Sequence, residues 1–247
     1  MVTGGASGIG RAMVARFAAA GMNVVVGDIE PGDGDFLAVQ CDVTSPDSMT
    51  TLREAAIDAF GAVHVVCLNA GVAASGPVID TPLSTWQWLF DVNVFGIVNG
   101  LHAFAPPLVA QGEGHLVLTA SAAGLITAPA LGAYAATKHA VVGMAAVLRD
   151  EVASAGIGVS VICPGVIRTR IFESERNRPD VQAGPTHLDI EQAAVYTDAA
   201  ANAPGPEVVA AAVHDAVVAD RFFVLPSPEV NFMIEARHDA VRAAMPR

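Results

Sequence analysis

The sequence predicts an α/β fold with a doubly wound parallel sheet of about seven strands and helices on both faces. Short runs rich in β-branched residues alternate with longer, Ala-rich amphipathic runs. Most of the short runs are apolar at nearly every position, as in parallel strands covered on both sides. With 247 residues, 53% of them hydrophobic, the chain is long and apolar enough for one domain with a deep core.

The expected elements follow this alternation along the chain. Only "MVT" precedes the first glycine-rich loop, so the first strand is expected to be either unusually short or truncated. Further strands are expected at 23–28, 36–43, 63–71, 114–121, 157–165 and 222–226, where β-branched and aliphatic residues cluster. Amphipathic periodicity predicts helices at 8–20, 46–60, 83–111, 133–155, 205–219 and 228–244. Strand and helix alternation of this kind implies right-handed crossovers within one sheet.

One segment, 168–206, departs from this rhythm, because it is long, polar and interrupted by Pro and Gly. A stretch of that length is typical of a lid or binding loop, so we expect a lid at about 170–205, with one or two short helices.

Composition excludes several classes of function. The net charge of −12 disfavours binding to nucleic acid and to anionic membranes. The seven histidines show no ligand spacing, so no metal site is expected. Cys41, Cys67 and Cys163 are predicted to be buried thiols, which suits a reducing compartment. The chain shows no signal peptide, and its apolar runs break before about 18 residues. We therefore expect a soluble, cytoplasmic protein without a membrane span.

The stretch "TGGASGIG" at 3–10 indicates a phosphate-binding loop. Gly4, Gly8 and Gly10 allow a tight turn and close approach of a ligand, and the N-terminus of the following helix attracts a pyrophosphate. The spacing differs from the G-x-G-x-x-G fingerprint of dinucleotide sites, so simple turn glycines are the alternative.

Asp28 strengthens the dinucleotide interpretation. It ends the predicted strand 23–28, 18 residues after Gly10. A carboxylate there accepts hydrogen bonds from adenosine ribose hydroxyls and repels a 2′-phosphate, which predicts NAD rather than NADP. The alternative is an aspartate that only caps the following turn.

Tyr134 and Lys138, the only lysine of the chain, lie one turn apart on the predicted helix 133–155. A nearby ammonium lowers the pKa of a phenol and prepares it for proton exchange with a substrate oxygen. A chance pair on a helix face is the alternative.

Taken together, the motifs resemble the classical short-chain dehydrogenase/reductase family. They are "TGGASGIG", "NAG" at 69–71, Asn93, Ser121, "YAATK" at 134–138 and "PG" at 164–165 with Thr169. The resemblance implies that Tyr134 is the general acid/base, that Lys138 lowers its pKa and binds the nicotinamide ribose, and that Ser121 positions the reacting oxygen. It also implies that Asn93 helps hold a water that links Lys138 to solvent.

The same resemblance implies the cofactor contacts and departs from the family at two points. The implied contacts are Gly4, Ser7, Gly8, Ile9, Asp28, Asp42, Val43, Asn69, Ala70, Gly71, Tyr134, Lys138, Pro164, Gly165, Ile167 and Thr169. Leu68 replaces a common asparagine, and the first strand is clipped. The cofactor half is expected at about 1–112 and the catalytic and substrate half at about 113–247.

The expected function is NAD-dependent hydride transfer between nicotinamide and a secondary alcohol or ketone, with a largely hydrophobic substrate. The resemblance also implies a homotetramer, or a homodimer, built through the helices 83–111 and 133–155. Two alternatives remain open at this point: a ketoreductase that acts on acyl or polyketide-like substrates, and a dinucleotide-binding regulatory protein without catalysis.

Overall fold

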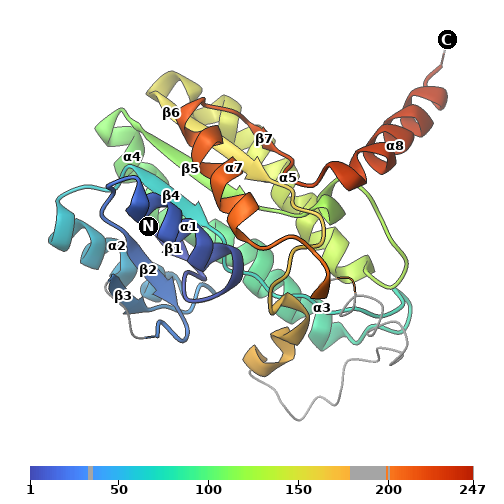
Figure 1. Cartoon of the computed structure of the whole chain (residues 1–247), viewed down its shortest axis with the longest axis horizontal. Helices are drawn as coiled ribbons and strands as arrows, with labels where there is room; N and C mark the ends of the chain where they lie inside the picture. The colour runs from blue at the N-terminus through green and yellow to red at the C-terminus, as the bar shows by residue number, and fades with distance from the viewer. Residues whose placement is uncertain (33–35, 179–198, 200, 247) are drawn as a thin grey trace.

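The computed structural model describes residues 1–32, 36–178, 199 and 201–246 (Figure 1). Within them, seven parallel strands form one sheet in the order β3-β2-β1-β4-β5-β6-β7. This is the predicted doubly wound fold, a Rossmann-like arrangement. The strands are β1 (Val2–Thr3), β2 (Val25–Asp28), β3 (Leu37–Gln40), β4 (Val65–Leu68), β5 (Gly114–Thr119), β6 (Ile157–Ile162) and β7 (Phe223–Val224).

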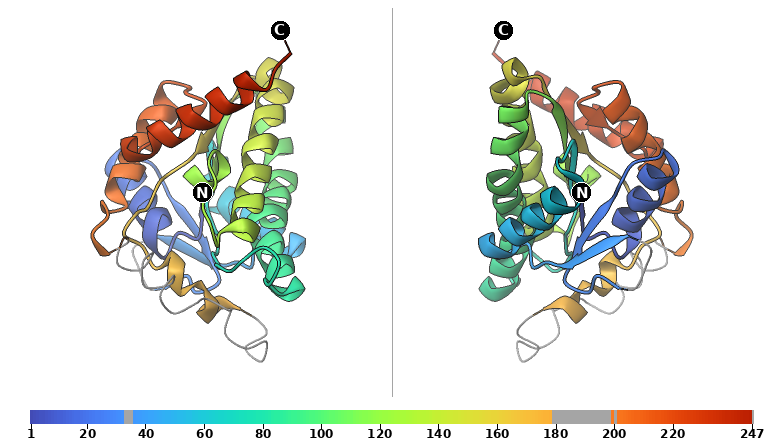
Figure 2. Two further views of the ribbon diagram at one scale, coloured as in Figure 1. Left: turned by 90° about the vertical axis from the view of Figure 1, so that its right-hand side faces the viewer. Right: turned by 90° about the vertical axis from the view of Figure 1, so that its left-hand side faces the viewer.

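Helices cover both faces of the sheet, as the views along its edges show (Figure 2). One face packs against α1 (Gly8–Ala19) and α7 (Glu207–Val218). The other packs against α2 (Pro46–Phe60), α4 (Gly96–Gln111) and α5 (Gly132–Val152). Two further helices are α3 (Leu83–Phe90), which precedes α4 in the chain, and α8 (Asn231–Ala243), which extends away from the sheet (Figure 1).

The two cores follow from the alternation of side chains along each strand. In β4, Val66 and Leu68 join the core under α2, α4 and α5, whereas Cys67 joins the core under α1 and α7. Central strands are therefore apolar at every position. The expectation of burial on both faces was wrong for β3, because it is an edge strand whose Leu37, Ala38 and Gln40 are exposed.

The two-residue strand β1 is bonded on both sides. The Met1 amino group donates to the Val65 carbonyl at 2.8 Å, and the Gly4 N–H donates to the Gly27 carbonyl at 2.8 Å. The hydroxyl of Thr3 accepts from the N–H groups of Asn69 (2.9 Å) and Ala70 (3.1 Å). These bonds place the loop after β4 directly beside the glycine-rich loop.

The predicted helix 83–111 is interrupted by a π-helical turn at Asp91–Phe95, where the Gly96 N–H bonds to the Asp91 carbonyl. Such turns are rare and frequent at functional sites. The helix continues through this turn, so the expectation that every apolar run breaks before about 18 residues was wrong. Leu83–Gln111 is the one described segment long and apolar enough to cross a membrane. Its side chains Ile97, Phe104 and Leu108 pack into the core under the face of the sheet that α4 covers.

The predicted lid lies mostly outside the described residues, since 179–198 and 200 are not described. Its first part forms 3₁₀ turns at Ile171–Asn177.

Candidate active site

A pocket of about 640 Å³ lies where the strands of the sheet end, and both Gly4 and Asn69 line it. These residues follow β1 and β4, the neighbouring strands at which the strand order reverses. Open α/β sheets bind ligands at this position. With the exception of Asn93, every site residue predicted from the sequence lines this one pocket.

The glycine-rich loop presents its backbone to the pocket. Gly4 and Gly8 have φ of +63° and +51°, which only glycine adopts without strain. A Cβ on Gly10 would lie 2.0 Å from the Gly4 carbonyl oxygen, so the loop also requires glycine where α1 packs on it. The first turn of α1 has neither a capping side-chain bond nor an acidic residue. Its N–H groups are therefore suited to bind a pyrophosphate.

Asp28 lies in the pocket wall at the end of β2 and is also a turn cap. Its Oδ2 accepts from the Ala6 N–H at 3.0 Å and its Oδ1 from the Glu30 N–H at 3.1 Å. The turn-capping interpretation of this residue is therefore confirmed, and its binding of a ribose stays a prediction. The two bonds fix the carboxylate next to the glycine-rich loop, and each oxygen keeps a lone pair for a ribose hydroxyl.

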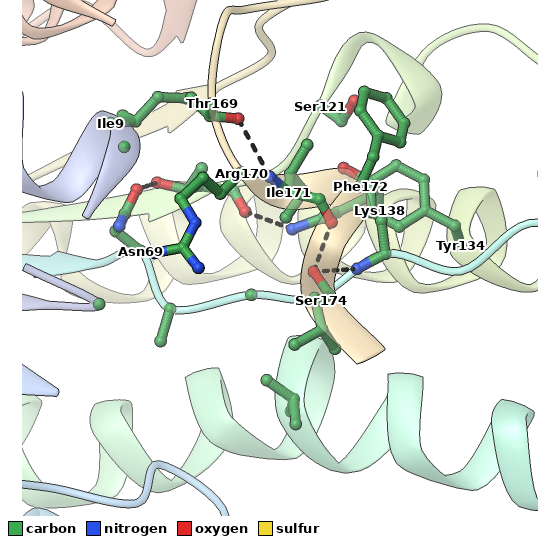
Figure 3. A pocket seen from close by; sticks show the side chains of 18 of the residues that line it. Ile9, Asn69, Ser121, Tyr134, Lys138, Thr169, Arg170, Ile171, Phe172 and Ser174 are labelled. Atoms are coloured by element: carbon green, nitrogen blue, oxygen red, sulfur yellow. Dashed lines mark hydrogen bonds between the residues drawn. The ribbon is translucent and has the colours of Figure 1, made fainter. Parts of the chain in front are cut away.

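Ser121, Tyr134 and Lys138 meet at the wall of the pocket (Figure 3). Ser121 follows β5, and the other two lie on α5. Lys138 is 4% exposed, donates from Nζ to the Thr119 carbonyl at 3.0 Å and lies 5.6 Å from the centre of the Tyr134 ring. The Ser121 Oγ accepts from the Ala123 N–H at 3.1 Å and lies close enough to Tyr134 to affect the pKa of its phenol. The sheet and α5 together therefore place a hydroxyl, a phenol and an amine around one point.

Burial dominates the acid–base properties of this group. Burial raises the pKa of Tyr134, and the hydrogen bond from Ser121 opposes this rise. Burial also lowers the pKa of Lys138 from 10.5 to about 8, with a smaller opposing effect from Cys163. Lys138 is not among the groups that shift the pKa of Tyr134, so the expected lowering is not seen in the protein alone, and the phenol is protonated at neutral pH.

Asn93 lies behind the pocket wall, in the π-helical turn. It is fully buried; its Oδ1 accepts from the Val72 N–H (2.8 Å), and its Nδ2 donates to the Val72 carbonyl (2.9 Å) and to Thr137 Oγ1 (3.1 Å). A Cβ on Gly71 would meet both Asn93 Oδ1 and Lys138 Nζ, at 3.2 and 3.4 Å. Asn93 therefore fastens the loop after β4 to α5 beside Lys138, and the implied role in a water relay stays a prediction.

Some pocket residues were not predicted from the sequence. Ser174 is buried and its Oγ accepts from the Ala73 N–H at 3.2 Å while donating to the Ile171 carbonyl, which joins the first part of the lid to the loop after β4. Trp88 and Met233 also line the pocket. Their positions depend on how distant elements pack, so no local pattern indicates them. Among the described residues, no group of three His, Cys, Asp or Glu could hold a metal ion.

Comparisons with known proteins agree with this geometry. A family model described as short chain dehydrogenase matches residues 1–180. The 1-deoxy-11-beta-hydroxypentalenate dehydrogenase of Streptomyces exfoliatus is 33% identical over 259 residues, covering 98% of this chain and 87% of that protein. The 3-alpha-(or 20-beta)-hydroxysteroid dehydrogenase of Mycobacterium tuberculosis is 36% identical over 178 residues, 68% of each chain.

A solved structure is similar over almost the whole chain. A short chain dehydrogenase/reductase from Burkholderia phymatum in complex with NAD has a TM-score of 0.93 and 33% identity, covering 99% of this chain and 94% of that one. The chain described here therefore belongs to the classical short-chain dehydrogenase/reductase family, whose dehydrogenases are oxidoreductases that act on CH–OH groups.

Proposed function

We propose that the protein is an NAD-dependent oxidoreductase that interconverts a hydrophobic secondary alcohol and its ketone. The observation that carries this proposal is the convergence of Ser121, Tyr134 and Lys138 in a pocket that continues to Asp28. A bound nicotinamide would accept or supply the hydride. The residues of the chain would provide orientation, proton transfer and exclusion of water.

Three side chains divide this work. Ser121 donates a hydrogen bond that orients the substrate oxygen, and Tyr134 gives a proton to that oxygen during reduction or takes it during oxidation. Lys138 is a compact ammonium that can bond the nicotinamide ribose and favour the phenolate form of Tyr134. Val72 and Thr137, fixed by Asn93, would hold the backbone around Lys138 in place. Asn93 itself is proposed to support the proton relay from behind the wall.

The residues present fit NAD. The uncapped first turn of α1, the positive φ of Gly4 and Gly8 and the fixed carboxylate of Asp28 would match a pyrophosphate and an adenosine ribose. The NAD complex of the Burkholderia phymatum relative supports the same choice. The remaining pocket residues predicted from the sequence would bind the adenine, the ribose and the nicotinamide; they are Ser7, Ile9, Asp42, Val43, Asn69, Ala70, Gly71, Pro164, Gly165, Ile167 and Thr169.

Replacing Asp28 with alanine is expected to lower the ratio of kcat/KM for NAD over NADP by about 100-fold, because the variant loses two ribose hydrogen bonds and the repulsion of a 2′-phosphate. Steady-state kinetics with both cofactors measure this ratio. Glu30→Ala is the matched control, since Glu30 is a carboxylate in the same turn and pocket. Equal ratios in the wild type and Asp28→Ala would contradict the assignment.

An apolar substrate is favoured by the lining of the pocket. The segments that follow β5, β6 and β7 contribute apolar side chains to it, namely Ile126, Leu131, Val166, Phe172, Val230 and Met233. Two relatives are named for dehydrogenation of a hydroxypentalenate and of a hydroxysteroid, and a steroid is a largely apolar alcohol.

A screen of secondary alcohols for NAD reduction is expected to give the highest kcat/KM with apolar ring alcohols such as hydroxysteroids. Sugars and short hydroxy acids, included as controls of similar reactivity, are expected to be poor substrates because the apolar wall leaves their hydroxyls without partners. A preference for sugars would refute the substrate class. NAD binding without oxidation of any alcohol would favour a regulatory protein.

A ketoreductase is the second candidate, and the raised pKa of Tyr134 favours it, since a protonated phenol is the form that reduction needs. Comparing kcat/KM for oxidation and reduction at pH 7 with one alcohol and ketone pair separates the two directions.

For the assembly, we propose a homotetramer, or a homodimer, formed through α4 and α5. Its support is a set of exposed apolar side chains on or next to these helices, namely Phe95, Val109 and Val147. We also propose a cytoplasmic location, because Cys41, Cys67 and Cys163 are all free thiols. The single domain would combine a cofactor half at about 1–112 with a catalytic half at about 113–247.

A further inference from the structure

The C-terminal helix α8 meets the body of the protein mainly through its first turns. Val230, just before the helix, and Met233 in its first turn line the pocket. Met233 and Ile234 are half-buried, whereas the rest of the helix is exposed and extends away from the sheet to the C-terminus (Figure 1). The contribution of α8 to the pocket therefore depends on how this helix is held.

Two tethers hold the segment, one on each side of Met233. Before the helix, Ser227 is 2% exposed and its Oγ accepts from the Gly165 N–H at 2.9 Å. On α8, Arg237 donates to the Leu125 carbonyl at 2.8 Å. Because Met233 and Arg237 are four residues apart, they lie on the same face of the helix.

Arg237 has a second partner, His139, on the catalytic helix. The Nδ1 of His139 lies 2.9 Å from the Ala135 carbonyl and donates to it in one neutral tautomer, which leaves Nε2 to accept from Arg237. His139 follows Lys138, and Leu125 precedes the pocket residue Ile126. Arg237 thus fastens α8 to the segment that carries the pocket residue Ile126 and to the helix that carries Tyr134 and Lys138.

From these contacts we infer that Val230 and Met233 are specificity-determining residues that contact the part of the substrate farthest from the reacting carbon, and that Arg237 is the positioning residue that holds them there. The inference rests on the proposed function, because it assumes an apolar alcohol oriented by Ser121 and Tyr134. A large ring system would reach Met233, whereas a small alcohol would be enclosed by the residues around Tyr134. The chemical class selected by this wall is a large, apolar ring alcohol.

The role of Met233 is tested with two alcohols, cyclohexanol and a hydroxysteroid. Met233→Ala is expected to lower the ratio of kcat/KM for the hydroxysteroid over kcat/KM for cyclohexanol about tenfold, because the steroid loses the apolar contact of the thioether side chain. Alanine favours helix, so α8 should persist. Phe232→Ala is the matched control, since Phe232 is 68% exposed and next to Met233. Equal changes for both alcohols, or none, would overturn the specificity role.

The role of Arg237 is tested with Arg237→Leu against Arg242→Leu, which removes the same charge from the same helix and breaks only an exposed pair with Asp239. Arg237→Leu is expected to raise KM for the hydroxysteroid about tenfold, leave kcat for cyclohexanol unchanged and speed amide hydrogen exchange in 231–243 but not in α7. Arg237→Lys should restore part of the KM. Unchanged KM and exchange would overturn the tether.

The outcomes separate this inference from the proposed function. If the wild type oxidises neither alcohol with NAD, the proposed function and the specificity role both fail. The exchange comparison then still decides whether Arg237 holds α8. If the wild type oxidises both alcohols and the variants match it, only the inference is wrong.

Discussion

Replacing Tyr134 with phenylalanine is expected to lower kcat by about 10³-fold and to leave the dissociation constant for NAD within about threefold of the wild type. The substitution removes only the hydroxyl of a side chain that lines the pocket together with Ser121. The ring, the packing of α5 and the position of Lys138 should persist. Stopped-flow or steady-state assays measure turnover, and calorimetry measures NAD binding.

The pH dependence gives a second test of the same role. Burial raises the pKa of Tyr134, and oxidation needs the deprotonated phenol, so kcat/KM for oxidation should rise with pH above 7 while that for reduction should not. Ser121→Ala removes the hydrogen bond that lowers this pKa, so its oxidation profile should shift to higher pH. Turnover of Tyr134→Phe within tenfold of the wild type, or identical profiles for Ser121→Ala, would contradict the assignment.

The sequence predicted best those parts of the site that depend on local geometry. The backbone turn that the glycines allow depends only on the loop itself. Tyr134 and Lys138, one helical turn apart, lie on the same face of their helix however the other elements pack. The ends of parallel strands meet at one edge of a sheet, so Asp28, Asn69 and Ser121 could be placed together once a doubly wound parallel sheet was predicted. All three line the pocket.

Features that depend on packing between distant elements were not predicted. The π-helical turn at Asp91–Phe95 has no sequence signature, and it places Asn93 against Val72 and Thr137 behind the wall. The docking of α8 rests on the contacts of Arg237 with Leu125 and His139. These partners are 112 and 98 residues away from Arg237 in the sequence. The pKa of Tyr134 depends on depth of burial, which no pattern of residues reports.

Lys138 is expected to lower the free energy of unfolding of the protein, although it supports catalysis. Its Nζ is buried and, among the described residues, bonds to the Thr119 carbonyl; burial lowers its pKa from 10.5 to about 8. A drop of this size corresponds to roughly 3 kcal/mol of unfavourable free energy at neutral pH. Replacing Lys138 with methionine removes this cost and loses one hydrogen bond of about 1 kcal/mol, so the free energy of unfolding should rise by about 2 kcal/mol at pH 7.

The same variant should lose nearly all turnover, because methionine cannot bond a ribose or favour the phenolate of Tyr134. Lys138→Arg is the matched control: it keeps the charge but replaces a compact ammonium with a forked guanidinium in a buried site, so it should lose most activity without the gain in stability.

The direction of the pH effect identifies Lys138 as the source of the difference in stability. The unfolded chain holds this proton up to about pH 10.5 and the folded protein only up to about 8, so the wild type binds fewer protons when folded and gains stability as the pH rises between these values. The advantage of Lys138→Met should therefore be full below about pH 8 and shrink toward pH 10.5. Urea unfolding of both proteins at pH 7 and 10, at matched protein concentration, measures it. An advantage that is constant with pH would assign the effect to packing and not to the buried charge.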